Sequence, residues 1–317
     1  MNLMLMLIGF VLLVVGGEFI IRSSVALSLK LSISKIVIGM TVVAFATSLP
    51  ELIVSINAAF NGSPSIAINN VIGSNIANIG LVLGLTCILG NMYVEKSFYR
   101  IDWPVMFAFS ILLYFIIARD NVIDQIDGIL LFTLLISFIV YLIIVVRAAT
   151  KNYNDDESVD NNLVHSTNFK IIIWMAIASL SLYFGSEWLV YGAINFAQEI
   201  GVSEAVISVS LIAIGTSIPE LATSLIAISK GEKGISLGNL IGSNIFNIGS
   251  VLGITAMIKP IVIDDLEILS RDILWMLVFA ALVLIIALLP KKDVIGKFKG
   301  FFLLLLYCIF IILAFTQ

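Results

Sequence analysis

The amino-acid sequence predicts an all-α integral membrane protein, with ten transmembrane helices arranged as a 5+5 inverted-topology repeat. Three observations support this fold class. The 317-residue chain is 60% hydrophobic and only 12% charged, whereas soluble domains carry about a quarter charged residues. About ten apolar stretches are long enough to cross the roughly 30 Å hydrocarbon core of a bilayer. The two halves of the chain also share a polar motif at a constant spacing.

The apolar stretches divide into two groups of five, separated by a polar segment. In chain order, the expected spans are 3–27, 36–60, 66–90, 103–118, 127–147, 170–198, 205–229, 235–258, 272–289 and 299–315. The polar segment 148–168 is interpreted as a mobile cytoplasmic linker outside the functional site. We therefore expect a first repeat over 1–147 and a second repeat over 169–317.

The distribution of positive charge predicts the orientation in the membrane. Of the 17 Lys and Arg residues, all except Arg119, Lys259 and Arg271 fall in segments that ten spans place on one side. Positive residues concentrate in cytoplasmic loops, so both termini are expected on the non-cytoplasmic side. There is no basic stripe of the kind that binds nucleic acid, and the expected surroundings are the lipid bilayer.

The repeat is carried by two motifs, each of which recurs 169 residues further along the chain. Residues 47–52 read TSLPEL and residues 216–221 read TSIPEL. Residues 69–86 and 238–255 are identical at 13 of 18 positions. Because each half has an odd number of spans, the second half must enter the membrane from the opposite side. Secondary transporters with this architecture bind their substrate near the midplane, where the repeats meet.

Each motif places one carboxylate deep within an apolar span, Glu51 in the first half and Glu220 in the second. An ionisable residue inside the membrane is costly and points to function. Two carboxylates in equivalent positions would give a formal charge of −2 near the midplane. This charge suits a hard divalent cation, and Ca²⁺ fits better than Zn²⁺ because no sulfur or imidazole ligand accompanies the acids.

Neutral oxygen atoms are expected to complete this site. Pro50 cannot donate a backbone hydrogen bond to Ala46, so the helix should break there and leave carbonyl oxygens of Ala46 and Thr47 free. Pro219 repeats this for Gly215 and Thr216. The second motif, GSNxxN, adds hydroxyl and amide groups that share a helix face. These are Ser74 and Asn78 in the first half and Ser243 and Asn247 in the second.

The sequence resembles the cation/Ca²⁺ antiporter superfamily, which includes the prokaryotic sodium/calcium exchangers. The resemblance is carried by the two α-repeats, which lie within 44–84 and 213–253 and read FATSLPELIVS with NVIGSNIANIG, and IGTSIPELATS with NLIGSNIFNIG. It implies four ion sites in a diamond at the midplane and electrogenic exchange of Na⁺ for Ca²⁺. It also implies a prokaryotic plasma (inner) membrane protein.

The resemblance also implies a role for each matching residue. Glu51 and Glu220 resemble the central carboxylates that Ca²⁺ and Na⁺ share, and Thr47 and Thr216 resemble residues whose carbonyls complete the calcium site. The flanking sodium sites are matched by serine side chains and alanine carbonyls, and the middle site by two asparagines. The serines and alanines are Ser48, Ser74, Ser217, Ser243, Ala44 and Ala213, and the asparagines are Asn78 and Asn247.

Two departures from the family pattern bear on function. Ala46 replaces the glycine that usually precedes Thr-Ser, whereas the second half keeps Gly215. Asn247 stands where some relatives carry an aspartate linked to potassium dependence or protonation, which disfavours a potassium requirement. The Thr-Ser-Leu-Pro-Glu motif differs from the pattern of the proton-coupled branch and favours Na⁺ as the counter-ion.

Other functions and roles remain open at this point. An H⁺/Ca²⁺ antiporter could use the same scaffold, and a divalent-cation channel is a further alternative. An intramembrane enzyme is disfavoured because no nucleophile–base pair accompanies the acids, and no cofactor is expected. The chain is expected to act as a monomer. Glu18 and its equivalent Glu187 either line access paths or anchor the helix at the interface, where Glu18 could pair with Arg22.

Overall fold

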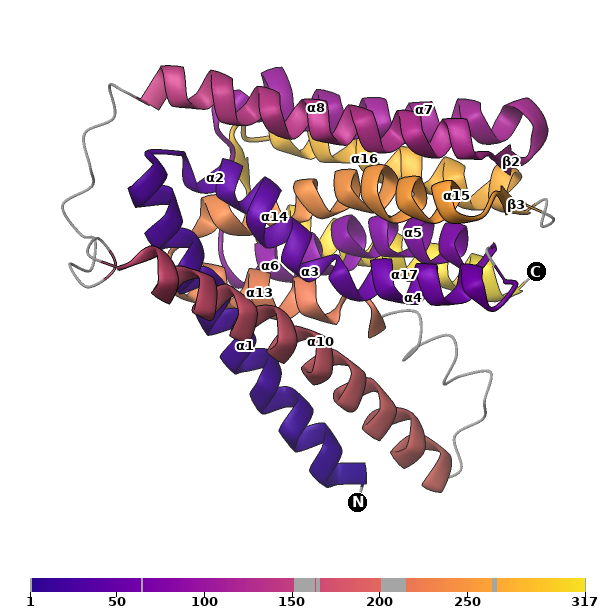
Figure 1. Cartoon of the computed structure of the whole chain (residues 1–317), viewed down its shortest axis with the longest axis horizontal. Helices are drawn as coiled ribbons and strands as arrows, with labels where there is room; N and C mark the ends of the chain where they lie inside the picture. The colour runs from indigo at the N-terminus through magenta and orange to yellow at the C-terminus, as the bar shows by residue number, and fades with distance from the viewer. Residues whose placement is uncertain are drawn as a thin grey trace.

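The computed structural model is a bundle of helices (Figure 1), described over residues 2–63, 65–150, 163, 166–200, 215–263 and 267–316. Within these ranges, eight helices are long and apolar enough to cross a membrane, or nine if one bent pair counts as a single span. Together with the low charge of the chain, this supports the predicted class of an all-helical membrane protein.

The first half contains five groups of helices, several of which include a short π-helical segment (η). The groups are α1 (Asn2–Leu31); α2 (Lys35–Ile38), η1 (Gly39–Val43), α3 (Ala44–Thr47) and α4 (Leu49–Phe60); α5 (Ser65–Ala77), η2 (Asn78–Leu83) and α6 (Gly84–Leu89); η3 (Phe98–Asp102) and α7 (Trp103–Asp120); and α8 (Gln125–Thr150).

The second half follows the same order. Its elements are α10 (Asn168–Glu199); α13 (Ile218–Ser229); α14 (Lys233–Phe246), η5 (Asn247–Leu252) and α15 (Gly253–Ile258); η6 (Ile268–Asp272) and α16 (Ile273–Leu288); and α17 (Lys297–Thr316). Each predicted span agrees with a described element to within five residues, except that 205–229 begins outside the described residues. The expected linker is shorter than predicted, because α8 continues to Thr150 and α10 begins at Asn168.

Two three-part helices form the centre of the bundle. In the span from Ile66 to Leu89, 78% of the residues in its most apolar stretch are buried, and in the span from Lys233 to Ile258 this share is 83%. The other long spans are only 22–39% buried, because their outer faces are apolar surface that lipid would cover. In Figure 1, α5, α14 and α15 lie between α7 and α8 on one side and the crossed pair of α1 and α10 on the other.

The α1–α10 pair is held by direct contact between the two backbones. A Cβ atom built on Gly9 would lie 2.6 Å from the backbone nitrogen of Leu189, and one built on Gly185 would lie 2.9 Å from that of Leu13. Small residues allow helices in lipid to approach closely and gain van der Waals contact. These two glycines, together with Gly16 and Gly192, therefore allow the close approach of α1 and α10.

Two short antiparallel strand pairs connect the halves, a feature that the sequence analysis did not predict. β1 (Met92–Tyr93) pairs with β4 (Val294–Ile295), and β2 (Val122–Ile123) pairs with β3 (Ile261–Val262). Each strand has only two residues and follows the end of a long helix. The pairing satisfies backbone groups between spans, where a helix no longer does so, and it joins the first half to the second twice.

Candidate functional site

The helix break predicted at Pro50 is present, and it falls at Ser48. The α3 helix ends at Thr47 and α4 begins at Leu49, with a bend of 42° between the two helical segments. Ser48 has φ −85° and ψ 3°, and Ser217 has φ −88° and ψ 3° just before α13 begins. The two motifs therefore have the same local geometry, and each places its glutamate in the first turn of the helix after the break.

The two glutamates are fully enclosed and their oxygen atoms are largely unpartnered. Glu51 and Glu220 are both 0% exposed. Neither carboxylate oxygen of Glu51 has a hydrogen-bond partner, nor does Oε2 of Glu220. Oε1 of Glu220 accepts a hydrogen bond of 3.4 Å from the hydroxyl of Ser243. A buried carboxylate without partners is costly, so this pair requires a cation, or protons, to be accommodated in the core.

Hydroxyl groups from both halves line the same region. The hydroxyl of Thr47 lies 3.3 Å from that of Ser243, and the hydroxyl of Ser74 lies 3.1 Å from that of Thr216. Each contact joins the broken helix of one half to the central helix of the other. The hydroxyls of Ser48 and Ser217 are buried and have no hydrogen-bond partner. The structure thus brings Thr47 to Ser243 and Ser74 to Thr216 through their hydroxyl groups, whereas the predicted role of the two threonines concerned their carbonyl groups.

Of the two predicted alanine ligands, Ala44 lies within the described residues. Ala44 is 0% exposed, and its carbonyl oxygen accepts hydrogen bonds from the backbone N–H of Ser48 at 3.0 Å and from the hydroxyl of Thr47 at 3.4 Å. A carbonyl oxygen that already accepts two hydrogen bonds needs to give one up to bind an ion well. Ala213 lies outside the described residues.

Asn78 and Asn247 stand where the two central helices change from α-helical to π-helical geometry. Each is the first residue of its π-helical segment, η2 or η5, and each is 0% exposed. Their side-chain oxygen atoms have no hydrogen-bond partner. Single π-turns within helices are frequent at functional sites, because they redirect side chains. The sequence motif identified these residues, although it gave no sign of the π-turns.

Three buried asparagines near the site were not assigned by the sequence analysis. Asn75 and Asn244 hold the amide groups of the middle pair, and Asn239 accepts a hydrogen bond of 3.1 Å from the hydroxyl of Thr47. Asn75 and Asn244 form part of the repeated GSNxxN motif. Their repetition across the two halves was a signal that could have identified them.

The site as a whole is built from oxygen atoms and carries two formal negative charges. Among the residues that the structure describes, no group of three or more His, Cys, Asp or Glu side chains could hold a metal ion. The arrangement combines two carboxylates with neutral hydroxyl, amide and carbonyl oxygens. Hard cations such as Ca²⁺ and Na⁺ prefer oxygen ligands of these kinds. The available chemistry is reversible cation binding within the membrane core.

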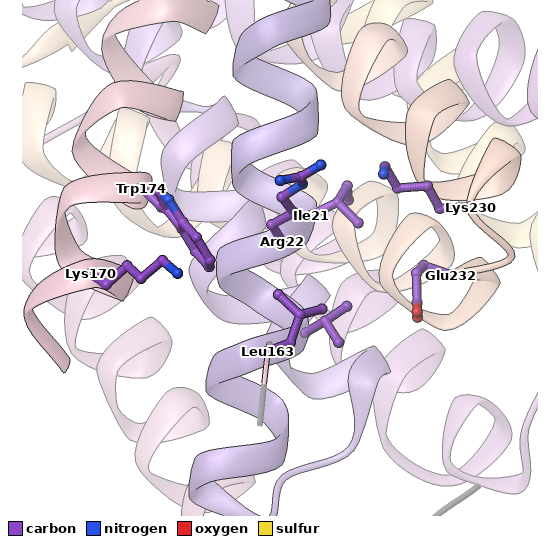
Figure 2. Close-up of a pocket in the computed structure, with 8 residues that line it drawn as sticks. Ile21, Arg22, Leu163, Lys170, Trp174, Lys230 and Glu232 are labelled. Carbon is purple, nitrogen blue, oxygen red and sulfur yellow. The ribbon is translucent and has the colours of Figure 1, made fainter. Parts of the chain in front are cut away.

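A separate polar pocket of about 410 Å³ lies where α1 and α10 meet the end of α13 (Figure 2). Arg22, Lys170 and Lys230 line it, and beside it Glu18 forms ion pairs with Arg22 at 2.6 Å and with Lys230 at 2.8 Å. The pairing of Glu18 with Arg22, which belongs to one of the two roles considered for Glu18, is present, and Lys230 extends it to another helix. Lys35 forms a further ion pair with Glu232 at 2.9 Å.

Comparisons with known proteins agree with this description of a helical membrane protein. A family model described as sodium/calcium exchanger protein matches residues 1–144 and 170–316. The chain is 28% identical to the sodium/calcium exchanger MaX1 of Methanosarcina acetivorans, over 99% of this chain and 98% of that protein. It is 34% identical to the inner membrane protein YrbG of Escherichia coli, over 84% of this chain and 83% of YrbG.

A solved structure of the sodium-calcium exchanger NCX_Mj has the same fold, with a TM-score of 0.81 and 31% identity over 97% of both chains. The fold and the buried carboxylates define a membrane transporter of the cation-exchanging class. Since the family model covers nearly the whole sequence, this chain belongs to the sodium/calcium exchanger family.

Proposed function

We propose that this protein is a secondary active antiporter that exchanges Na⁺ for Ca²⁺ across the membrane. The observation that carries the proposal is the pair of fully buried glutamates, one from each half, whose carboxylate oxygens lack protein partners apart from one contact with Ser243. A charge of −2 in the core matches one Ca²⁺ or more than one Na⁺. The names of the family and of the relative MaX1 support these two ions as substrates.

Each predicted residue receives a role in this proposal. Glu51 and Glu220 bind Ca²⁺ and Na⁺ in turn, with the carbonyl groups of Thr47 and Thr216 completing the calcium site. The middle site lies between the amide oxygens of Asn78 and Asn247. The flanking sodium sites use four serines and two alanines, namely Ser48, Ser74, Ser217, Ser243, Ala44 and Ala213. The unpartnered hydroxyls of Ser48 and Ser217 support their assignment as ligands.

Exchange follows from the competition of the two ions for one pair of carboxylates. Bound Ca²⁺ uses the charge that a full set of Na⁺ would need, and bound Na⁺ excludes Ca²⁺. The site opens to one side at a time, so an ion released on one side must be replaced before the protein returns. We infer that α1 and α10, which cross outside the central helices (Figure 1), move against the core between the two states.

The proposed architecture is a 5+5 inverted repeat of ten transmembrane helices, with repeats over 1–147 and 169–317. The equivalent order of elements in the two halves supports it, as do the matching backbone angles at Ser48 and Ser217. The excess of positive charge on one side favours both termini on the non-cytoplasmic side of the plasma membrane. The pocket lined by Arg22, Lys170 and Lys230 then faces the cytoplasm.

The proposal is tested by ⁴⁵Ca²⁺ uptake into proteoliposomes that are loaded with Na⁺ and diluted into Na⁺-free buffer, with pH and K⁺ equal on both sides. We expect uptake that depends on the outward Na⁺ gradient and is absent in Glu220→Gln. Uptake driven only by an imposed pH gradient would instead identify an H⁺/Ca²⁺ antiporter. Ca²⁺ flux without counter-transport under a clamped membrane potential would identify a channel.

A further inference from the structure

Four buried asparagines form a crossed network of hydrogen bonds at the junction of the two halves. Two are the middle-site residues Asn78 and Asn247, and the others are Asn75 and Asn244, which are 1% and 2% exposed. Asn78 donates from Nδ2 to Oδ1 of Asn244 at 3.1 Å, and Asn247 donates from Nδ2 to Oδ1 of Asn75 at 3.1 Å. Each middle-site residue is therefore held by an asparagine from the opposite half.

The direction of these hydrogen bonds is set by backbone carbonyl groups. Asn75 donates from Nδ2 to the backbone carbonyl oxygen of Asn244 at 3.2 Å, and Asn244 donates to that of Asn75 at 3.4 Å. A carbonyl oxygen only accepts hydrogen bonds, so the nitrogen of each amide must face it. The oxygen of each amide then faces the middle-site residue of the other half, which must present its own nitrogen.

Sulfur atoms favour the same orientation. Nδ2 of Asn75 lies 3.8 Å from Sδ of Met276, and Nδ2 of Asn244 lies 3.8 Å from Sδ of Met106. A thioether sulfur is a weak acceptor and cannot donate. The two hydrogens of each amide nitrogen thus both have acceptors, and reversing either amide would place its oxygen against a carbonyl oxygen and a sulfur.

We propose that Asn75 and Asn244 are positioning residues that fix Asn247 and Asn78 with their side-chain oxygens directed toward the transported ions. The inference rests on the proposed function, since it assumes that cations occupy the middle of the site. Both middle-site nitrogens are engaged and both Oδ1 atoms are buried and unpartnered. The middle of the site therefore offers acceptors only and suits a cation, or a water that donates, on both sides.

We call the action of Asn75 on Asn247, and of Asn244 on Asn78, the relay. It makes a prediction that a purely structural role of these asparagines does not. Asn75 should act on ion binding through Asn247, its partner in the other half, and to a lesser degree through Asn78, its neighbour on the same helix. Two residues that act as one unit give non-additive effects in a double-mutant cycle, whereas independent residues give additive effects. The coupling energy between Asn75 and Asn247, which lie in opposite halves, should therefore be larger than that between Asn75 and Asn78, which lie in the same half.

The experiment measures the thermal stabilisation of the purified protein by Na⁺ and separately by Ca²⁺, with choline chloride keeping the ionic strength constant. We compare Asn75→Leu, Asn247→Leu, Asn78→Leu and the doubles Asn75→Leu/Asn247→Leu and Asn75→Leu/Asn78→Leu. We expect Asn75→Leu to weaken apparent Na⁺ affinity about fivefold, the factor that corresponds to one net hydrogen bond. The crossed double should be no weaker than Asn247→Leu alone.

Thr86→Val is the matched control, because the Thr86 hydroxyl is buried but donates only to carbonyls of its own helix, those of Val82 and Leu83. It should leave the Na⁺ affinity unchanged. If Asn75→Leu lowers the melting temperature but binds Na⁺ like the wild type, or if the crossed pair is additive, the relay is wrong. A wild type that is stabilised by neither ion would overturn the proposed function together with the relay.

A second variant keeps the test decisive if Asn75→Leu does not fold. Asn244→Leu removes the equivalent acceptor for Nδ2 of Asn78, so Na⁺ affinity should fall about fivefold, and adding Asn78→Leu should not weaken it below that of Asn78→Leu alone. Wild-type affinity in Asn244→Leu, or additive effects in this double variant, would overturn the proposal.

Discussion

The two halves of this protein match closely at the ion site and differ in charge at the ends of the helices. Ser48 and Ser217 have nearly the same backbone angles, and both glutamates are fully buried. By contrast, Glu18 bridges Arg22 and Lys230, whereas the equivalent positions of the other half hold Glu187, Tyr191 and Asn61. We infer that the equivalent parts bind the ions, and that the charged end influences the balance between the two access states.

The largest expected effect comes from breaking the symmetry of the carboxylates. Glu51→Gln or Glu220→Gln leaves one negative charge for a divalent ion, with the other carboxylate buried beside an amide. Removing one partner of a buried charge interaction costs about 3 kcal/mol or more, which corresponds to a loss of roughly a hundredfold or more in apparent Ca²⁺ affinity. Na⁺-driven ⁴⁵Ca²⁺ uptake should fall to the level of protein-free vesicles.

The control for this experiment is insertion of the variants, judged by equal yield and equal elution from a sizing column. Because the substitution keeps the shape of the side chain, both variants should insert normally. Uptake at the wild-type rate by either variant would show that the corresponding glutamate is not a ligand. A loss in only one of the two would indicate that the halves contribute unequally to the site.

Much of the site could be predicted from the sequence because its chemistry recurs. A glutamate after proline in an apolar span is costly, and finding it twice at one spacing indicates a shared site. The π-turns at Asn78 and Asn247 could not be predicted, because π-turns are rare and the GSNxxN motif gives no sign of them. The strand pairs were missed for a similar reason: two-residue strands such as Met92–Tyr93 give no periodic pattern.

The second prediction concerns the helix breaks and tests whether the halves are equally rigid. Pro50→Ala and Pro219→Ala each restore a backbone N–H, which can bond the carbonyl of Ala46 or Gly215 and close the break that frees the neighbouring carbonyls of Thr47 and Thr216. One net hydrogen bond is worth about 1 kcal/mol, so half-saturating Ca²⁺ should rise about fivefold. Pro50→Ala should have the larger effect, because alanine favours helix over glycine by about 1 kcal/mol.

Concentration dependence of ⁴⁵Ca²⁺ uptake measures this difference, and Ala46→Gly in the Pro50→Ala background is the matched control. That double variant gives the first half the glycine that the second half already has. We expect the half-saturating Ca²⁺ concentration of this double variant to equal that of Pro219→Ala. Equal values for both single variants would argue that the residue before the break does not influence the carbonyls.

The third prediction concerns the charged end. Lys230→Gln or Glu18→Gln removes an ion pair that joins α1 to the end of α13, and α1 is expected to move during exchange. Partly exposed ion pairs are worth about 0.2–1 kcal/mol, so the exchange rate should increase by up to about fivefold. The double variant should resemble Glu18→Gln, since Glu18 forms the ion pairs with both Arg22 and Lys230. Lys291→Gln, an exposed lysine elsewhere, is the control and should exchange at the wild-type rate.

The smallest expected effect belongs to Glu187, which occupies the position equivalent to Glu18. Glu187 is exposed, and within the described ranges it forms no ion pair. Isolated surface substitutions usually change stability by less than about 0.5 kcal/mol, so Glu187→Gln should alter the exchange rate by no more than about twofold.

Salt provides a further test of Glu18. Added choline chloride weakens the ion pairs of Glu18 in the wild type. Glu18→Gln lacks these ion pairs, so its exchange rate should depend less on the choline chloride concentration than the wild-type rate does.

This pair of variants distinguishes the two roles considered for the acidic residues. If both glutamates lined access paths, Glu187→Gln and Glu18→Gln would change apparent Na⁺ affinity by similar factors, one on each side of the membrane. If Glu18 acts by anchoring α1, only its variant should change the rate, and the affinity for Na⁺ should stay the same in both. Measuring the exchange rate and the apparent Na⁺ affinity together, on vesicles of defined orientation, separates these outcomes. An ion pair that anchors α1 shifts the balance between the access states without contacting the ions, so it changes the rate and not the affinity.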